Sequence, residues 1–252
     1  MSKISPEHPR AESLRIRGRL VEGFKAGLVV PEGLAAHGRG EAFDYIIGEK
    51  TAEQAKKAVE AAAAMLLTAK LPVISVNGNV AALVPDGVVE LADAVGAKLE
   101  VNLFHGSAER EAKIAEHLRE HGAKEVFGID EKFSTKIEEI HSDRRKVDKR
   151  GIAAADVVLV PLEDGDRTEA LRKLGKKVIA IDMNPMSRTS RAADVTIVDN
   201  IVRALPRLVG GVRRLSRLGR VQLRKIVCDF DNTKNLKAMV ELISKRLKKI
   251  SR

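Results

Sequence analysis

The chain has 252 residues, of which 44% are apolar and 32% are charged. A chain of this size can bury a substantial core, and we expect one α/β domain spanning residues 1–252. Apolar stretches such as 61–67 are far shorter than a membrane span, and no charged-then-apolar leader opens the chain, so we expect a cytoplasmic protein with no membrane partner. The single cysteine, Cys228, excludes a disulfide framework and a cysteine-based zinc site.

The net charge of +10 belongs to the end of the chain. Residues 203–252 hold 15 Lys/Arg against three Asp/Glu, a net charge of +12, whereas residues 1–202 carry −2. Such a basic segment raises the alternative of nucleic-acid binding. Only one of the seven aromatic residues, Phe230, lies in it, and no duplex-reading motif is visible, so solvated helix faces or a dimer contact explain the charge better. The high charge, with two glutamines and no tryptophan, is typical of thermophilic proteins.

The first seventy residues predict helices around a loop. Apolar residues between 14 and 24 recur at helical spacing and indicate a helix that ends near Gly27. Between 31 and 48 four glycines predict a loop-rich segment that carries Arg39 close to a ligand. Thr51 and Gln54 form the pattern of a capping box, and we expect a helix to follow as far as Leu67.

From residue 71 short apolar runs alternate with helical patterns. Buried strands are predicted at 71–76, 99–103, 125–129, 157–162, 177–183 and 195–198. Helices are predicted at 88–96, 107–121, 131–150 and 166–175, and only helices from 201 onward, the last over 233–250. This alternation predicts a doubly wound parallel sheet. The expected organisation is an N-terminal helical segment (1–70), an α/β core (71–200) and basic C-terminal helices (201–252).

Ligands of an open parallel sheet bind beyond the carboxyl ends of its strands. Asn77, Gly78 and Asn79 lie at such an end and begin a helix, where backbone amides suit a phosphate or carboxylate. A simple Asn-capped turn is the alternative. No Walker A motif is present and no Gly-x-Gly-x-x-Gly follows a strand, so the common nucleotide fingerprints are missing.

Two histidines are candidates for chemistry. His105 follows the next strand, just before a helix that Ser107 can cap and that carries Arg110 in its first turns. The turn either faces a ligand or is exposed and merely capping. His141 lies beside the charged residues 143–145 on a stretch expected to be helical, where a solvated face is the ordinary explanation.

Acidic and hydroxyl-rich turns follow the later strands. Carboxylates of the 163–168 turn either hold Mg²⁺ or form an acidic surface loop. Another strand ends in Asp182, and residues 184–191 then offer three hydroxyls and two arginines before a further strand ends in Asp199 and Asn200. Hydroxyl donors, guanidinium groups and a strand-end acid favour a phosphorylated, hydroxylated ligand such as a nucleotide.

Three segments carry a resemblance to a known family. They are Ser75–Ala82 (Ser-Val-Asn-Gly-Asn-Val-Ala-Ala), Gly165–Glu169 (Gly-Asp-Arg-Thr-Glu) and Ile181–Ser190 (Ile-Asp-Met-Asn-Pro-Met-Ser-Arg-Thr-Ser). Together they resemble the archaeal phosphopantothenate synthetases, also called 4-phosphopantoate–β-alanine ligases, and the likeness extends over essentially the whole chain. It implies a Rossmann-like homodimer of coenzyme A biosynthesis that uses ATP to join 4-phosphopantoate to β-alanine and releases AMP and diphosphate.

The resemblance also implies ligands. The residues it assigns to ATP are Arg17, Arg39, Ile181, Asp182, Met183, Ser187, Arg188, Asp199 and Asn200. The strand-end argument, rather than the resemblance, assigns 4-phosphopantoate to Asn77, Gly78, Asn79 and His105.

A carboxylate does not react with an amine at neutral pH, so the implied reaction requires an acyl-adenylate. Mg²⁺ with Arg17, Arg39 and Arg188 could stabilise charge on the diphosphate that leaves. His105 or His141 could accept a proton from β-alanine, and the sequence does not choose between them. A sugar-phosphate isomerase or a nucleotide-dependent oxidoreductase on the same sheet is a further alternative, although the dinucleotide fingerprint is absent.

Overall fold

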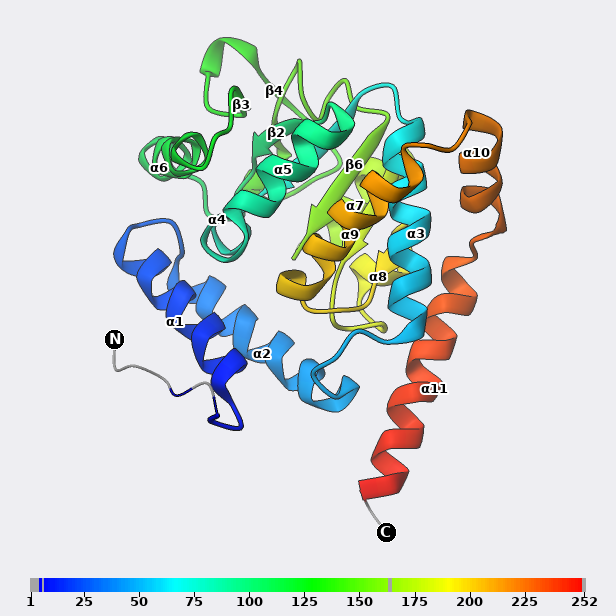
Figure 1. Ribbon diagram of the computed structural model, residues 1–252. Helices are drawn as coiled ribbons and strands as arrows, with labels where there is room; N and C mark the ends of the chain where they lie inside the picture. Colours follow the sequence, from blue (N-terminus) through cyan, green and yellow to red (C-terminus); the bar gives the residue numbers. More distant parts are fainter. Residues whose placement is uncertain (1–4, 6, 163–164, 251–252) are drawn as a thin grey trace.

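The computed structural model describes residue 5, residues 7–162 and residues 165–250. Its centre is a parallel sheet of six strands in the order β3-β2-β1-β6-β7-β8 (Figure 1). These strands are β1 (Pro72–Val76), β2 (Lys98–Val101), β3 (Val126–Phe127), β6 (Val157–Pro161), β7 (Lys177–Ile181) and β8 (Val195–Ile197). All six lie where the sequence predicts a strand, and the predicted α/β, Rossmann-like fold class is confirmed.

The strand order reverses between β1 and β6, the two strands at the middle of the sheet. Their register pairs Ile74 with Leu159, and Ile74 also faces Leu99 of β2. Every residue of β1 and of β6 is buried, because helices cover both faces of the sheet. In a doubly wound sheet the crevice beyond this reversal is the usual place for a ligand.

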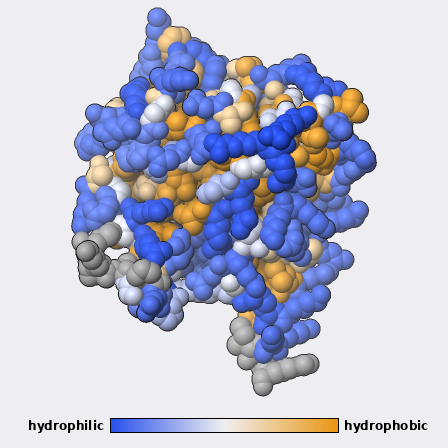
Figure 2. Space-filling view, viewed as in Figure 1, coloured by the Kyte–Doolittle hydropathy of each residue, from blue (hydrophilic) through white to orange (hydrophobic). Residues whose placement is uncertain are grey.

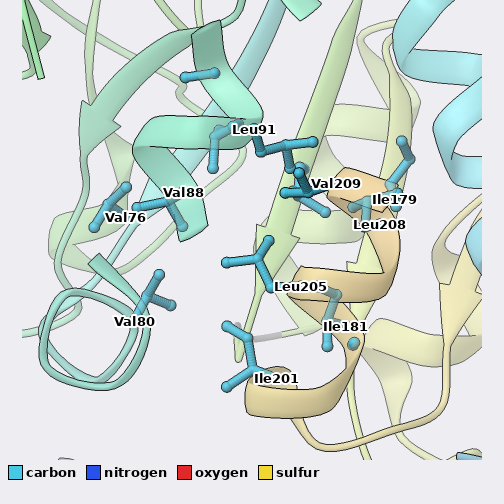
Figure 3. Close-up of a cluster of buried hydrophobic side chains, with 14 of the residues drawn as sticks. Val76, Val80, Val88, Leu91, Ile179, Ile181, Ile201, Leu205, Leu208 and Val209 are labelled. Carbon is cyan, nitrogen blue, oxygen red and sulfur yellow. The ribbon is translucent and has the colours of Figure 1, made fainter. Parts of the chain in front are cut away.

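Helices surround the sheet (Figure 1). They are α1 (Ala11–Lys25), α2 (Pro31–Ile47), α3 (Glu53–Thr68), α4 (Gly78–Leu83), α5 (Pro85–Val95), α6 (Ala108–Glu120), α7 (Gly165–Lys173), α8 (Arg188–Ala192), α9 (Ile201–Leu215), α10 (Arg220–Asp229) and α11 (Asn232–Ile250). On one face α9 packs against α3 and α5. Its residues Leu205 and Leu208 point into a core shared with Ile179 and Ile181 of β7 (Figure 3).

The expectation of a loop-rich segment at 31–48 is wrong. The segment forms α2, which has Pro31 in its first turn and ends at Ile47. Gly48 follows with a φ of 102° and closes the helix in the left-handed conformation. The internal glycines weaken the helix but let it approach other backbone closely. A Cβ at Gly33 would lie 2.5 Å from Asn79 Oδ1, and one at Gly40 would lie 2.9 Å from Met183 Cε.

The helix expected over 131–150 is also absent. Two short 3₁₀ turns, η1 (Glu131–Phe133) and η2 (Asp143–Arg145), alternate there with β4 (Ser134–Lys136) and β5 (Lys146–Asp148), which form an antiparallel pair. Ile137, Ile140 and Val147 have helix-like spacing, yet the strands and the turn between them bury all three in the core on the second face of the sheet.

The capping box expected at Thr51 is not formed. Helix α3 begins after Ala52 without a side-chain cap, and the Thr51 hydroxyl instead donates to Asp199 Oδ2 at 2.6 Å.

The helices expected beyond 201 are confirmed, and α11 extends away from the sheet towards the C-terminus (Figure 1). On the face of Figure 1, apolar side chains gather near the centre within a largely hydrophilic surface (Figure 2). Among the described helices, none is both long and apolar enough to cross a bilayer.

Candidate functional site

A cavity of about 510 Å³ lies at the carboxyl ends of β1, β2, β6 and β7, with α2 forming one wall. Among the described residues, the charged ones that line it are Glu32, Arg39, Arg110, Arg144, Asp182 and Arg188, joined by the imidazoles of His37 and His105. Four guanidinium groups against two carboxylates give this described lining an excess of positive charge, which suits a ligand that carries phosphates. The cavity therefore lies where the sequence predicts a ligand, beyond the carboxyl ends of the strands.

The turn after β1 forms the floor of the cavity at the switch point. Asn77 caps α4 by accepting from Val80 N, and its Nδ2 donates to the carbonyl oxygens of Pro161 and Leu162 at 3.1 Å. Because its side chain already bonds protein on both sides of the switch point, Asn77 holds β1 and β6 in place. A Cβ at Gly78 would collide with the carbonyl oxygen of Leu28, so only glycine fits there.

Asn79 joins this floor to α2. Its Nδ2 donates to the carbonyl oxygen of Gly33 at 2.8 Å, which fixes the first turns of α2 against α4. The close approach at Gly40 fixes the middle of α2 against Met183. Between these two contacts α2 carries His37, and beyond them Phe43, neither of which the sequence singled out as a ligand.

The loop after β7 forms a second wall. Asp182 accepts from Asn184 N and from the Ser187 hydroxyl, and Ser187 in turn caps α8 by accepting from Ser190 N. Burial raises the pKa of Asp182, although these hydrogen bonds and the nearby charge of Arg39 oppose the shift. Arg39 itself lines the cavity without a hydrogen bond or ion pair to the described residues.

Two arginines meet near the end of β2. Arg110 donates from Nε to the carbonyl oxygen of Leu28 at 2.9 Å and from Nη1 to that of His105 at 2.6 Å. Arg144, which is buried, donates to the carbonyl oxygen of Asn102 at 3.1 Å. Burial lowers the pKa of Arg110, and the charge of Arg144 lowers it further. An anion between the two side chains would relieve this repulsion.

Several predicted residues lie outside the lining. Arg17 is on α1 and forms a bidentate pair with Glu41 of α2, whose Oε2 lies 2.6 Å from Arg17 Nη2. Burial alone would raise the pKa of Glu41, but the hydrogen bonds from Arg17 and Ser13 outweigh burial and lower it. Ile181 is part of the core, and His141 is exposed in the segment between β4 and η2.

Asp199 and Asn200 follow β8 and are both buried. Asn200 caps α9 and donates to Asp44 Oδ2 at 2.9 Å, while Asp199 accepts from Thr51 and Arg203. Their side chains therefore bond α2 and α9 rather than line the cavity. Of the acidic turn proposed for Mg²⁺, residues 163 and 164 lie outside the described part of the chain.

Comparison with known proteins shows which family the chain belongs to. A model of the family described as phosphopantothenate/pantothenate synthetase matches residues 54–246. A 4-phosphopantoate–beta-alanine ligase of Thermococcus kodakarensis is 52% identical over 252 residues, which cover all of this chain and 96% of the relative. A protein of the same name from Methanosarcina mazei is 49% identical over 98% of this chain and 97% of its own length. The chain belongs to the phosphopantothenate/pantothenate synthetase family.

Proposed function

We propose that the chain is an ATP-dependent ligase that joins 4-phosphopantoate to β-alanine in coenzyme A biosynthesis and releases AMP and diphosphate. The observation that carries the proposal is the arginine-lined cavity at the switch point of a sheet in a chain half identical to ligases of that name. Both ATP and 4-phosphopantoate are phosphorylated, so one cavity that binds both needs cations at separate places.

We propose that ATP occupies the lobe beside Asp182, Met183, Ser187 and Arg188, with Arg39 reaching its phosphates from α2. The buried strand end and the capped α8 give these groups fixed positions. Ile181 supports this wall from the core. Arg17 is bonded to α2 through Glu41, and Asn200, which follows β8 together with Asp199, is bonded to α2 through Asp44. We therefore assign all three residues to the ATP side of the site.

4-Phosphopantoate is assigned to the other lobe, at 77–79 and His105. Backbone amides at the start of α4 and the pair Arg110 and Arg144 are suited to its phosphate. Its carboxylate would then approach the α-phosphorus of ATP across the floor of the cavity. Holding the two reactants in line supplies much of the rate, and the arginines stabilise charge that develops on the diphosphate.

Mg²⁺ is proposed as a companion of ATP. Within the described residues no group of three or more acidic, histidine or cysteine side chains is arranged to hold a metal ion. The donors fit an ion that arrives on the triphosphate, because such an ion keeps its phosphate and water ligands and needs only one or two carboxylates. Glu32 and Asp182 are the carboxylates that line the cavity in the part of the chain that the structure describes. When bound, the ion would neutralise phosphate charge.

We also propose a homodimer in the cytoplasm of a heat-adapted archaeon. The family resemblance supports the dimer, and the composition supports heat adaptation. The single cysteine, Cys228, is exposed and free, which fits the reducing cytoplasm. Light scattering of the purified chain at micromolar concentration measures the dimer directly.

The decisive experiment is a product assay with each substrate omitted in turn. We expect AMP and diphosphate to form only when ATP, 4-phosphopantoate and β-alanine are all present at steady state. Formation of ADP and phosphate would instead indicate an acyl-phosphate intermediate, and no substrate-dependent cleavage of ATP would reject the proposed ligase.

A further inference from the structure

We propose that His37 is the catalytic base that takes a proton from the ammonium group of β-alanine, an inference that rests on the proposed ligase function. The sequence offered His105 and His141 for this role. The fold brings a third histidine to the junction of the two substrate lobes, and three independent features of its surroundings support the assignment.

The first feature is its position on α2. Gly33, His37 and Gly40 are spaced i, i+4 and i+7, so they share one face of the helix. At one end of this face Gly33 touches Asn79, in the lobe assigned to 4-phosphopantoate. At the other end Gly40 touches Met183, in the lobe assigned to ATP. His37 therefore lines the cavity between the lobes, where the acyl-adenylate must form.

The second feature is that the imidazole is available. Neither ring nitrogen of His37 has a hydrogen-bond partner in the described part of the chain, and Nε2 is buried. A buried polar atom without a partner costs stability and requires an explanation, and a catalytic role is one of the recognised explanations. Burial lowers the pKa of His37 and Arg17 of α1 lowers it further, while Glu41 and Asp44 of α2 oppose the shift, and a lowered pKa favours the neutral ring that a base requires.

The third feature is the state of the other acceptors. Of the six histidines, all of which lie in the described part of the chain, only His37 and His105 line the cavity, and His105 is exposed with its ring edge-on to Phe104. The oxygens of Asp182 already accept from Asn184 and Ser187. Glu41, beside His37, is already bound by Arg17, yet its negative charge stabilises an imidazolium four residues away.

The chemical step balances as follows. An N–H bond of the ammonium group breaks, and its proton moves to an imidazole nitrogen of His37. The freed lone pair attacks the carbonyl carbon of the acyl-adenylate and forms the C–N bond. As the tetrahedral intermediate collapses, the bond between carbon and the phosphate oxygen breaks, AMP leaves with that electron pair, and a second proton passes from nitrogen to the departing phosphate.

The test separates the two half-reactions in His37→Gln. Formation of the adenylate needs no amine base and is measured as 4-phosphopantoate-dependent exchange of diphosphate into ATP. Hydroxylamine is mostly unprotonated at neutral pH, so it should capture the adenylate as a hydroxamate without His37. We expect the variant to keep both reactions near the wild-type rate and to lose about 10²- to 10⁴-fold in amide formation with β-alanine.

Matched substitutions make the result specific. His117→Gln changes a half-buried histidine of α6 that lies outside the cavity lining, and it should leave all three rates unchanged. Equal losses of exchange and amide formation in His37→Gln would assign the residue a structural or ATP-binding role and overturn the proposal. Normal amide formation, or a selective loss in His105→Gln or His141→Gln instead, would also overturn it. Absence of exchange in the wild type would reject the acyl-adenylate and with it this role of His37, whereas absence of any substrate-dependent cleavage of ATP would reject the ligase function itself.

Discussion

Arg188 enters the cavity from the first position of α8, directly after the cap Ser187. Its Nε and Nη2 donate to the two carboxylate oxygens of Glu169 at 3.1 and 2.9 Å. The pair is exposed, and exposed ion pairs contribute little to stability. The triphosphate that we propose for this site would therefore displace Glu169 at small cost, and before it binds, the carboxylate keeps the guanidinium oriented.

Substitution of Arg188 should affect turnover more than ATP binding. Arg188→Lys keeps the charge but loses the planar group that holds two oxygens at once, so we expect kcat to fall about 10- to 100-fold, and further in Arg188→Ala. Steady-state kinetics give kcat and the KM for ATP, with thermal unfolding as a control for the fold. Glu169→Gln, which only frees the arginine, should retain activity. Normal kcat and KM in the alanine variant would remove Arg188 from the site.

Glu100 is a buried carboxylate whose pKa is strongly raised. It is fully buried in β2, and its two oxygens accept from the backbone N–H groups of Asp148 and Ile152. Burial raises the pKa of Glu100 from 4.5 to about 7, although these hydrogen bonds oppose the shift. Between these two pH values the folded protein binds more protons than the unfolded chain, so stability falls as the pH rises.

Glu100→Gln should remove this pH dependence. From pH 4.5 to pH 7 the free energy of unfolding of the wild type should fall relative to that of the variant by about 2–4 kcal/mol, because each unit of pKa shift contributes about 1.4 kcal/mol. Urea denaturation of both proteins across this range measures the difference. Parallel curves for the two proteins would show that Glu100 ionises normally in the fold.

At the scale of elements, the stability of α2 and its contact with α4 depend on where its glycines lie. Gly33 faces Asn79 and Val29 with no room for a methyl group, whereas a Cβ at Gly38, on the exposed side, would have no atom within 4 Å. The two positions therefore separate helix propensity from contact with the wall of the site.

Gly38→Ala should stabilise the protein by about 1 kcal/mol, because alanine favours a helix interior. Gly33→Ala gains the same propensity but pushes Asn79 from its hydrogen bond with Gly33 O, so we expect it to be about 1–2 kcal/mol less stable than Gly38→Ala. Chemical denaturation compares the two variants directly. Equal stabilisation of both would mean that α2 is not held against α4 at this point.

The sequence predicts the sheet well because its signal is local. Strands buried on both faces appear as short β-branched runs, as in Val157–Pro161, and the parallel arrangement then follows from the alternation with helices. Strand ends in turn identify the region of the cavity, including Asp182 and Arg188. The glycines of α2 mislead because glycine usually breaks a helix, and only the long-range contacts with Asn79 and Met183 explain them.

Other features of the site depend on contacts that no local pattern contains. Arg144 belongs to a segment whose charges predict a solvated helix, but the β4–β5 pair turns its side chain into the cavity. His37 lies in a segment whose glycines predict a loop. The sequence signal that favours α2 is the placement of Pro31 in its first turn and of Gly48 directly after its end, because these residues commonly begin and end a helix.

At the scale of the whole molecule, the excess of basic residues and the cavity lie in different parts of the chain. The basic excess lies in α9 to α11, where Arg213 pairs with Glu90 and Lys225 with Asp229. The arginines of the cavity come from the part of the chain whose net charge is −2. Local placement by the fold, rather than total charge, makes the cavity suitable for anions.

A buried network joins distant parts of the chain behind this cavity. Arg203 of α9 donates to Asp44 of α2 at 2.5 and 3.1 Å, and to Asp199 at 2.7 and 2.9 Å. Asp44 and Asp199 are 5% and 1% exposed, and Asn200 and Thr51 donate to them as well. One guanidinium thus holds two buried carboxylates and fixes α2 to the end of β8.

Arg203→Met should destabilise the protein by about 3–5 kcal/mol, because it leaves both carboxylates buried without their cation. Arg207→Met is the matched control, since Arg207 is exposed and bonds only the Thr51 hydroxyl among the described residues, and its free energy of unfolding should stay near that of the wild type. Asp44→Asn combined with Arg203→Met should recover part of the loss. Urea denaturation gives the stabilities, and hydrogen exchange of residues 31–47 should rise in Arg203→Met if the network anchors α2. Unfolding free energies of Arg203→Met and Arg207→Met that agree within error would mean that the Arg203 network does not anchor α2.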